Sequence, residues 1–429
     1  MKRVFAMALC LSLVTVSLFG CNNGGGAQEH ASGSETAAES VPANEPAAEM
    51  AEEEVTLTVM NVISGDNVTY NELLADFAAQ YPNIKIEHIS TVNAELKKQI
   101  KIDMLAGELP DVLMFDNPDF ASFAASGYLM DITDQVEQWE EKPHYWQATI
   151  DAVTFNNRIY GLPWECNGLG LWYNKTLLDE LGFNVPETWD EVLAICEAAK
   201  TKGYYGFAMA APASEVGTFQ FIPWLYAAGG SIEKLDTPEA EKALSFLSDL
   251  IQEGYMSKEV LGYSHGDLTK VFQGGNIVMM ENGSWVGSNL KDGCSFEYGV
   301  TTLPVIKAGD TPTNCLGGYH IGISADCQHP QEALAYLKFM SSAQSNLIWC
   351  KGAGLLPTNE ETAKDPIFSE DPWDKFLPGL PGAVARVNAF WPELSVNVYT
   401  AVQSALSGEQ TPAEALAGAE ALNADYWGF

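Results

Sequence analysis

The sequence predicts an α/β fold of two halves with a cleft between them. Strand and amphipathic-helix patterns alternate after residue 55, and the alternation restarts near residue 188. The segment Val55 to Phe429 is long enough for two domains of ordinary size. Ligands of open α/β sheets lie at the carboxyl ends of strands, and small-molecule sites favour domain interfaces, so a cleft site is expected.

The N-terminus reads as an export signal. Lys2 and Arg3 precede an apolar run, Val4 to Phe19, that is too short to span a bilayer comfortably. We expect residues 1–20 to be a lipoprotein signal peptide, because Leu18-Phe19-Gly20-Cys21 resembles the cleavage box of bacterial lipoprotein precursors. On this interpretation Cys21 carries the lipid anchor; the alternative is an ordinary secretory signal that ends near a cysteine.

The tract that follows is predicted to be a disordered linker. Residues 22–54 contain no Phe, Tyr, Trp, Lys or Arg and are rich in Gly, Ala, Ser and Glu. Such a segment cannot bury enough apolar surface to offset its ordering entropy, so residues 21–54 are expected to form a lipid-anchored tether. The net charge of −35 argues against nucleic acid and anionic lipid as partners.

The first half begins with a β-branched strand, "VTLTVMNVIS". A helix with a capping box at Thr69–Glu72 follows it, and then the strand "IKIEHIS". The helix "NAELKKQIKIDMLAG" is expected to end at Gly107, before the strand "DVLMFD". This alternation predicts a parallel sheet with crossover helices.

The second half repeats the pattern. A capping box at Thr188–Glu191 opens the helix "WDEVLAICEAAKTKG", whose C-cap is Gly203, and the strand "YGFAMA" comes next. Further helices are expected at "FIPWLYAAGG" and "TPEAEKALSFLSDLIQEGY", with a strand at "NIVMMEN" and a helix opened by Ser284-Trp285. Two helices form the tail, the second opened by a capping box at Thr411–Glu414 with Pro412 at its first position.

The cysteines and histidines indicate neither a metal centre nor a cofactor. The mature thiols show no CxxC or Cys/His zinc spacing, and we interpret them as buried free thiols rather than a disulfide framework. They are Cys166, Cys196, Cys294, Cys315, Cys327 and Cys350. The six histidines are scattered, and there is no phosphate loop or GxSxG elbow.

Five segments in series resemble bacterial extracellular solute-binding proteins of the maltose-binding type. One begins "YGLPWECNGLGLWYNKTLLDELGF", and another is "GGYHIGISADCQHPQEALAYLKFMSSAQSNLIWCKGAGLLPTNEE". The others are "SGYLMDITD", "FQGGNIVMMENGSWVGSN" and "YGVTTLPV". Together they cover essentially all of Val55 to Ala417.

The resemblance implies a two-lobed periplasmic-binding-protein-like fold with a hinge and an interlobe ligand cleft. It places residues 55–165 and 320–356 in lobe 1, and residues 166–319 and 357–429 in lobe 2. The chain is expected to cross between lobes near 164–167, 314–319 and 354–357. Such a protein is not an enzyme: it captures a sugar or oligosaccharide outside the cytoplasmic membrane and delivers it to the permease of an ATP-binding-cassette importer. We expect a monomer without a cofactor.

Sugar recognition needs flat apolar faces for the ring and planar donors and acceptors for the hydroxyl groups. The resemblance assigns hydroxyl binding to Asp66 and sugar stacking to Phe115, Phe219 and Trp285. Further ligand-binding candidates lie at strand ends and predicted lobe crossings: Asp116, Asn117, Trp164, Glu165, Asn167, Gly318, Tyr319, Arg386 and Trp391. Pro118 and Asp119 stand where the family has an acidic and basic pair, which argues against maltodextrin itself.

Two other functions are weighed against sugar binding. The same receptor fits a polyamine or another cationic or polyol solute if Asp66, Asp116, Asp119 and Glu165 cage a cation with nearby aromatic rings. A surface glycoside hydrolase would instead use a carboxylate pair such as Asp116 and Glu165 as acid and nucleophile or base.

Overall fold

The computed structural model describes residues 53–427 apart from residue 381. The predicted signal peptide, the anchor Cys21 and almost all of the predicted linker lie outside these residues. Within the described range, no helix has the length and apolar character needed to cross a membrane.

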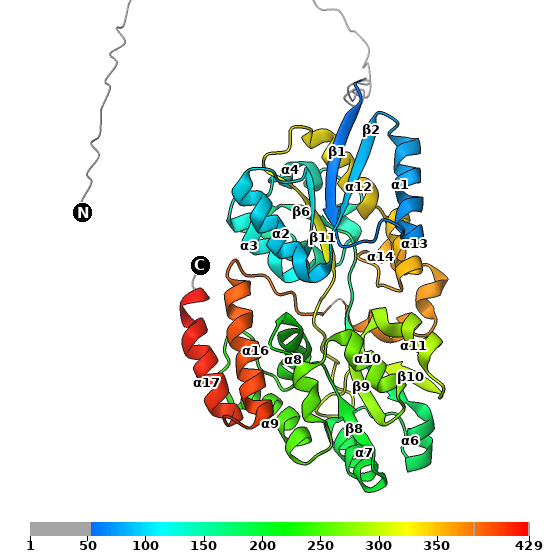
Figure 1. Ribbon diagram of the computed structural model, residues 1–429, viewed down its shortest axis with the longest axis vertical. Coiled ribbons are helices and arrows are strands. Elements are labelled where there is room, and N and C mark those ends of the chain that lie inside the picture. The colour runs from blue at the N-terminus through cyan, green and yellow to red at the C-terminus, as the bar shows by residue number, and fades with distance from the viewer. Residues whose placement is uncertain (1–52, 381, 428–429) are drawn as a thin grey trace, which may run out of the picture. The chain divides into compact units, whose positions relative to one another are not determined.

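A five-stranded mixed sheet forms the centre of the first lobe (Figure 1). In spatial order its strands are β2 (Ile84–Ser90), β1 (Val55–Asn61), β3 (Val112–Asp116), β11 (Tyr319–Ile323) and β6 (Gly161–Pro163). The predicted parallel pairing is confirmed for β1 with both β2 and β3. β11 comes from much later in the chain and runs antiparallel to β3, with Tyr319 opposite Asp116.

Helices and a short hairpin surround this sheet. Before β6 the helices are α1 (Val68–Gln80), α2 (Asn93–Ala106), η1 (Asn117–Asp119), α3 (Phe120–Ala125), α4 (Thr133–Glu137), η2 (Lys142–His144) and α5 (Gln147–Ala152). The hairpin is β4 (Thr154–Phe155) with β5 (Arg158–Ile159). After β11 come α12 (Pro330–Ser341), α13 (Ala343–Ala353), α14 (Glu360–Ala363) and η5 (Pro366–Ser369).

The helix ends test the capping predictions. The box at Thr69–Glu72 is wrong: α1 begins earlier, and the side chain of Asn67 accepts the Tyr70 amide instead. Asn67 wins because its short carbonyl-bearing side chain is a stronger N-cap than threonine. α2 ends as predicted at Gly107, which adopts the left-handed conformation.

The second lobe contains a four-stranded sheet. Its strands are β10 (Tyr298–Thr301), β7 (Leu169–Asn174), β9 (Ile277–Gly283) and β8 (Tyr205–Ala208), in that spatial order. Only the β8–β9 pair of this sheet is parallel, because β7 enters from the first lobe and runs antiparallel to both its neighbours.

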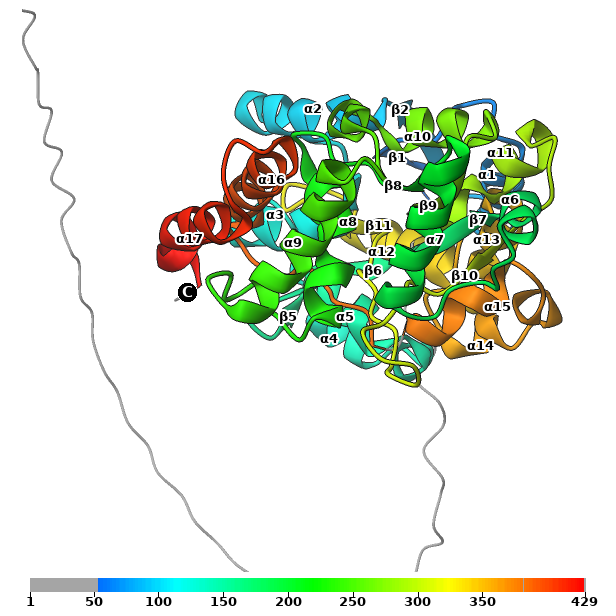
Figure 2. The ribbon, with the colours of Figure 1, turned by 90° about the horizontal axis from the view of Figure 1, so that it is seen from below.

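The second lobe carries most of the long helices. Those before β11 are α6 (Lys175–Leu181), α7 (Trp189–Lys202), α8 (Glu215–Ala227), α9 (Pro238–Gln252), η3 (Lys258–Gly262), α10 (His265–Gln273), η4 (Ser284–Val286) and α11 (Gly287–Gly293). The later ones are α15 (Trp373–Phe376), η6 (Leu377–Gly379), α16 (Trp391–Ser407), α17 (Pro412–Asn423) and η7 (Ala424–Tyr426). Figures 1 and 2 show α16 and α17 beside α8 and α9. The capping boxes predicted at Thr188 and Thr411 are both confirmed.

Each lobe has its own apolar core, and few side chains reach both. Trp285, Trp373 and Leu377 are partly buried against both cores. The six cysteines within the described range are free thiols, five of them buried and Cys294 half-buried. Trp285 therefore lies where the two lobes meet.

Segments far apart in sequence connect the lobes side by side. Cys166 pairs with Leu356, and Asn167 pairs with Gly317. Gly318 has a φ of +123°, and an added Cβ would lie 2.4 Å from the carbonyl oxygen of Glu165, so only glycine fits this approach.

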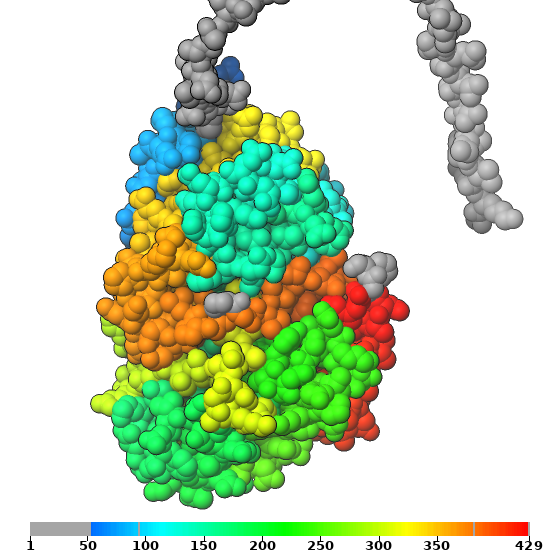
Figure 3. Space-filling view, turned by 180° about the vertical axis from the view of Figure 1, so that it is seen from behind, coloured from blue at the N-terminus to red at the C-terminus, as the bar shows by residue number. Residues whose placement is uncertain are grey.

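The last crossing lies later in the chain than the sequence predicts. Phe368 still belongs to the core of the first lobe, whereas Phe376 belongs to the core of the second. The boundary at residue 356 is therefore too early, because η5 packs back onto the first lobe before α15 reaches β7 and β10. In Figure 3 this orange segment runs between the cyan and green parts of the surface.

Candidate functional site

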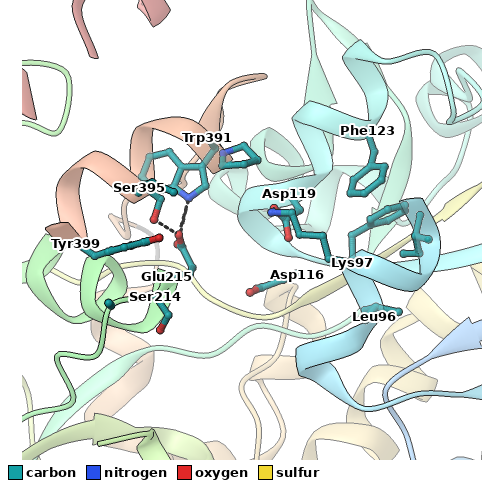
Figure 4. Close-up of a pocket in the computed structure, with 15 residues that line it drawn as sticks. Leu96, Lys97, Asp116, Asp119, Phe123, Ser214, Glu215, Trp391, Ser395 and Tyr399 are labelled. Carbon is teal, nitrogen blue, oxygen red and sulfur yellow. Dashed lines mark hydrogen bonds and ion pairs between the residues drawn. The ribbon is translucent and has the colours of Figure 1, made fainter. Parts of the chain in front are cut away.

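A pocket of about 500 Å³ is lined by side chains from both lobes (Figure 4). The first lobe contributes residues of α2, the end of β3 and the start of α3: Leu96, Lys97, Ile100, Phe115, Asp116, Asp119 and Phe123. The second lobe contributes the start of α8 and the first turns of α16: Ala213, Ser214, Glu215, Trp391, Pro392, Ser395, Val396 and Tyr399. Its size suits a small solute with one or a few rings.

Asp116 is the acidic group of the first wall. β3 ends at this residue, and in Figure 4 its carboxylate points across the pocket toward the side where Glu215 lies. Burial raises the pKa of Asp116 to about 7, against the opposing attraction of the Arg386 guanidinium. The neighbouring acid Asp119 forms an ion pair with Lys97 of α2. Asp116 is therefore the carboxyl group of this wall that a ligand can engage.

Glu215 organises the opposite wall. At the first turn of α8, its carboxylate forms an ion pair with Arg386 and accepts the hydroxyl of Ser395. The indole Nε1 of Trp391 donates to both of its oxygens at 3.1 Å. Arg386 and Trp391 are almost fully buried, so this single carboxylate fixes the segment around Arg386 and the start of α16 relative to α8.

Next to Arg386, the rings of Phe219 and Trp285 form a group that we call the aromatic column. The guanidinium carbon of Arg386 lies 4.7 Å from the ring centre of Phe219, and its Nη2 donates to the carbonyl of Leu316 at 3.1 Å. Phe219 lies 6.3 Å from the indole of Trp285 at an interplanar angle of 31°. Arg386, Phe219, Trp285 and Trp391 are thus brought together by Glu215 and its neighbours, although they come from three separate parts of the chain.

Several predicted residues pack inside the first lobe. Trp164 is 1% exposed and stacks on Trp349, with ring centres 5.1 Å apart. Glu165 accepts the Trp349 Nε1–H at 2.5 Å, and burial raises the pKa of Glu165 to about 7. Phe115 lines the pocket but packs mainly against Phe120 and Phe123. The structure therefore places Trp164 and Glu165 behind the pocket rather than in its wall.

The remaining candidates lie at the crossing strands or away from the pocket. Asn117 is buried and lies 3.2 Å from the Nε2 of His320, while Asn167, Gly318 and Tyr319 belong to the paired crossing strands. Asp66 is exposed in the turn before α1, where it accepts the Ser64 hydroxyl.

Sequence reasoning missed Glu215, Lys97, Ser214, Ser395 and Tyr399. Glu215 stands in "ASEVGTF", where nothing local distinguishes it from a surface acid, and its partners lie about 170 residues later. Among the described residues, no group of three or more His, Cys, Asp or Glu side chains is arranged to hold a metal ion.

Comparison with known proteins agrees with this geometry. The family model for "bacterial extracellular solute-binding protein" matches residues 72–373. The multiple sugar-binding protein of Streptococcus mutans is 28% identical over 316 residues, which are 70% of this chain and 74% of that protein. It and other relatives are named as binding proteins.

Two solved structures show the same fold. The maltose-bound MalE3 of T. maritima is 29% identical, with a TM-score of 0.75 over 86% of this chain and 99% of that chain. A solute-binding protein of Thermotoga lettingae bound to α-D-tagatose is 27% identical, with the same TM-score and coverage. The family model covers well over half of the sequence, so the chain belongs to the bacterial extracellular solute-binding proteins.

Proposed function

We propose that this protein is the receptor of an ATP-binding-cassette importer and captures a sugar or oligosaccharide between its lobes for delivery to the permease. The observation that carries the proposal is a pocket, lined by both lobes, that sets Trp391, Tyr399 and Phe123 beside hydroxyl and carboxyl groups. Relatives named for, or bound to, maltose, tagatose and multiple sugars support a carbohydrate ligand.

The mechanism follows from contacts on both sides of the pocket. A solute held by Asp116 of the first lobe and by the α16 wall of the second is bound best when the lobes are closed, so it shifts their population toward the closed form. The crossing strands need to change φ and ψ at only a few residues to allow this motion. The permease then recognises the closed pair of lobe surfaces.

The charges favour a neutral solute over a polyamine. Of the acids that could cage a cation, Asp119 is paired with Lys97, Glu165 holds Trp349, and Asp66 is exposed in its turn. Of these four acids only Asp116 and Asp119 line the pocket, and Asp119 is the one held by a lysine. The buried Arg386 lies close enough to Asp116 to affect its charge. A glycoside hydrolase is not favoured either, because Glu165 lies outside the pocket lining and the family consists of binding proteins.

The family is extracellular, so the protein is exported. Residues 1–20 supply a lipoprotein signal in our proposal, Cys21 is acylated, and the Gly/Ala/Glu-rich tract tethers a monomeric receptor to the outer face of the cytoplasmic membrane. Metabolic labelling with an alkyne fatty acid tests this anchor: the full-length chain is labelled and Cys21→Ala is not. Labelling of Cys21→Ala would disprove it.

A thermal-shift panel of neutral sugars, polyols and amines tests the function. A ligand at 100 times its Kd stabilises the folded state by about 2.7 kcal/mol, which raises the Tm of a chain of this size by roughly 3 °C. We expect a neutral mono- or oligosaccharide to give this shift, with one-to-one stoichiometry by calorimetry and recovery of the sugar unchanged. A shift with amines alone, or a cleaved sugar, would contradict the proposal.

A further inference from the structure

One histidine lies beside the indole of Trp285 and is not used by the function proposed above. The ring centre of His265 is 5.0 Å from that of Trp285, edge to face at 60°. It is also 6.3 Å from Phe219, at 77°. His265 therefore borders the aromatic column at the meeting of the two lobes, on the side of Trp285 where α10 begins.

The backbone of His265 is held firmly. It is the first residue of α10, whose N-terminus is closed by a capping box between Ser264 and Asp267. Its carbonyl oxygen accepts the Thr269 hydroxyl at 2.7 Å and the side-chain amide of Asn282 at 3.2 Å. Because Asn282 lies near the end of β9, just before Trp285, these bonds hold the backbone of His265 close to the segment that carries the indole.

The side chain, in contrast, has an unused polar atom. Nε2 of His265 is buried and has no hydrogen-bond partner among the described residues. Burial lowers the pKa of His265 to about 4, so the ring is neutral at pH 7 and offers one donor and one acceptor. A buried polar atom is normally hydrogen-bonded, so this nitrogen is free to pair with a group from outside the chain.

We propose that His265 is a specificity-determining residue of the saccharide site, where its imidazole edge binds one hydroxyl group of the sugar ring that stacks on Trp285. This inference rests on the proposed function. An indole face accepts the C–H side of many sugars with little selectivity, whereas a directional hydrogen bond rejects an epimer or a deoxy sugar that leaves the polar group unpaired.

Two variants separate hydrogen bonding from packing. His265→Phe keeps a flat ring against Trp285 but removes both nitrogens, and His265→Gln keeps a donor and an acceptor. His144→Phe is the matched control, because His144 on η2 is exposed and lies beside Glu361 rather than beside Trp285 or Phe219. The probe is whichever of maltose, cellobiose, lactose, sucrose or melibiose binds the wild type most tightly by titration calorimetry, together with its monodeoxy derivatives.

We expect His265→Phe to weaken binding of the probe by roughly 10- to 100-fold, His265→Gln by less than about 5-fold, and His144→Phe not at all. One monodeoxy derivative should bind the wild type more weakly than the parent sugar does, by that same factor. His265→Phe should bind this derivative and the parent sugar with equal affinity. The inference would be overturned if wild type and His265→Phe bound the sugar equally well, or if no single hydroxyl group mattered to the wild type alone. Either result would leave the receptor function intact. If none of the sugars binds the wild type, the proposed function and this inference fall together. Should His265→Phe lose its native circular dichroism, His265→Leu is read in its place.

Discussion

Replacing Glu215 by alanine should destabilise the second lobe and loosen one wall of the pocket. The substitution removes the acceptor for Arg386, for the Trp391 indole and for the Ser395 hydroxyl at one time. The Arg386 side chain is only 3% exposed, so its charge would lose its ion-pair partner in a desolvated place. Arg386 would keep one hydrogen bond, to the carbonyl of Leu316.

The magnitude follows from these contacts. Breaking a fully buried ion pair costs about 3–5 kcal/mol, but the Glu215 side chain is 31% exposed, which screens its charge in part. We therefore expect Glu215→Ala to lower the free energy of unfolding by about 2–3 kcal/mol and the Tm by roughly 3–4 °C. Arg386→Met removes the other partner of the ion pair. The double variant should therefore lose about 1–2 kcal/mol less free energy of unfolding than the two single losses added together.

Urea denaturation followed by circular dichroism measures these differences. The matched control is Glu393→Ala, an exposed acid in the first turn of α16, which should cost no more than about 0.5 kcal/mol. A cost for Glu215→Ala as small as that of the control, or strictly additive single effects, would refute the role assigned to Glu215.

Three further outcomes are expected. Trp285→Leu should weaken saccharide binding by at least about 10-fold in titration calorimetry, and unchanged affinity would exclude Trp285 from the site. An unfolded aspartate ionises near pH 4, whereas folded Asp116 keeps its proton up to about pH 7, so stability falls as the pH rises between these values. Because a pKa raised from near 4 to about 7 is worth about 4 kcal/mol, Asp116→Asn should stabilise the protein by up to that amount more at pH 8 than at pH 4 in parallel urea titrations, and an equal effect at both values would contradict this. Gly318→Ala should cost about 3 kcal/mol or more because its Cβ would collide with the Glu165 carbonyl, while Gly418→Ala, with open space around it, should be neutral or stabilising; denaturation midpoints distinguish them.

Local sequence signals predicted much of the fold. The boxes at Thr188 and Thr411 and the glycine end of α2 are confirmed because their partners lie within four residues. The box at Thr69 failed because Asn67, two residues earlier, caps the Tyr70 amide, so the helix has already begun at Thr69. The late lobe crossing was missed since Phe368 is assigned to a core by distant contacts, which no local pattern records.

In the candidate site, too, the sequence identified some positions and misjudged others. Trp285 stands after a strand in a recognisable segment, and it lies at the meeting of the lobes, as a stacking residue must. Trp164 is also a tryptophan in a recognisable segment near a predicted lobe crossing, yet in the structure Trp349 stacks on it inside the core. The sequence cannot distinguish these cases, because the neighbour that buries Trp164 is contributed by α13, far along the chain.

The two walls of the pocket come from parts of the chain that lie far apart in sequence. The first-lobe wall is built from residues 96–123, whereas the wall from Trp391 to Tyr399 lies on α16, after the last lobe crossing. Substitutions in that one helix would therefore change one side of the pocket and leave the other side as it is. On the function proposed above, exchanging α16 for the matching helix of another member of the family should alter which solute is taken up.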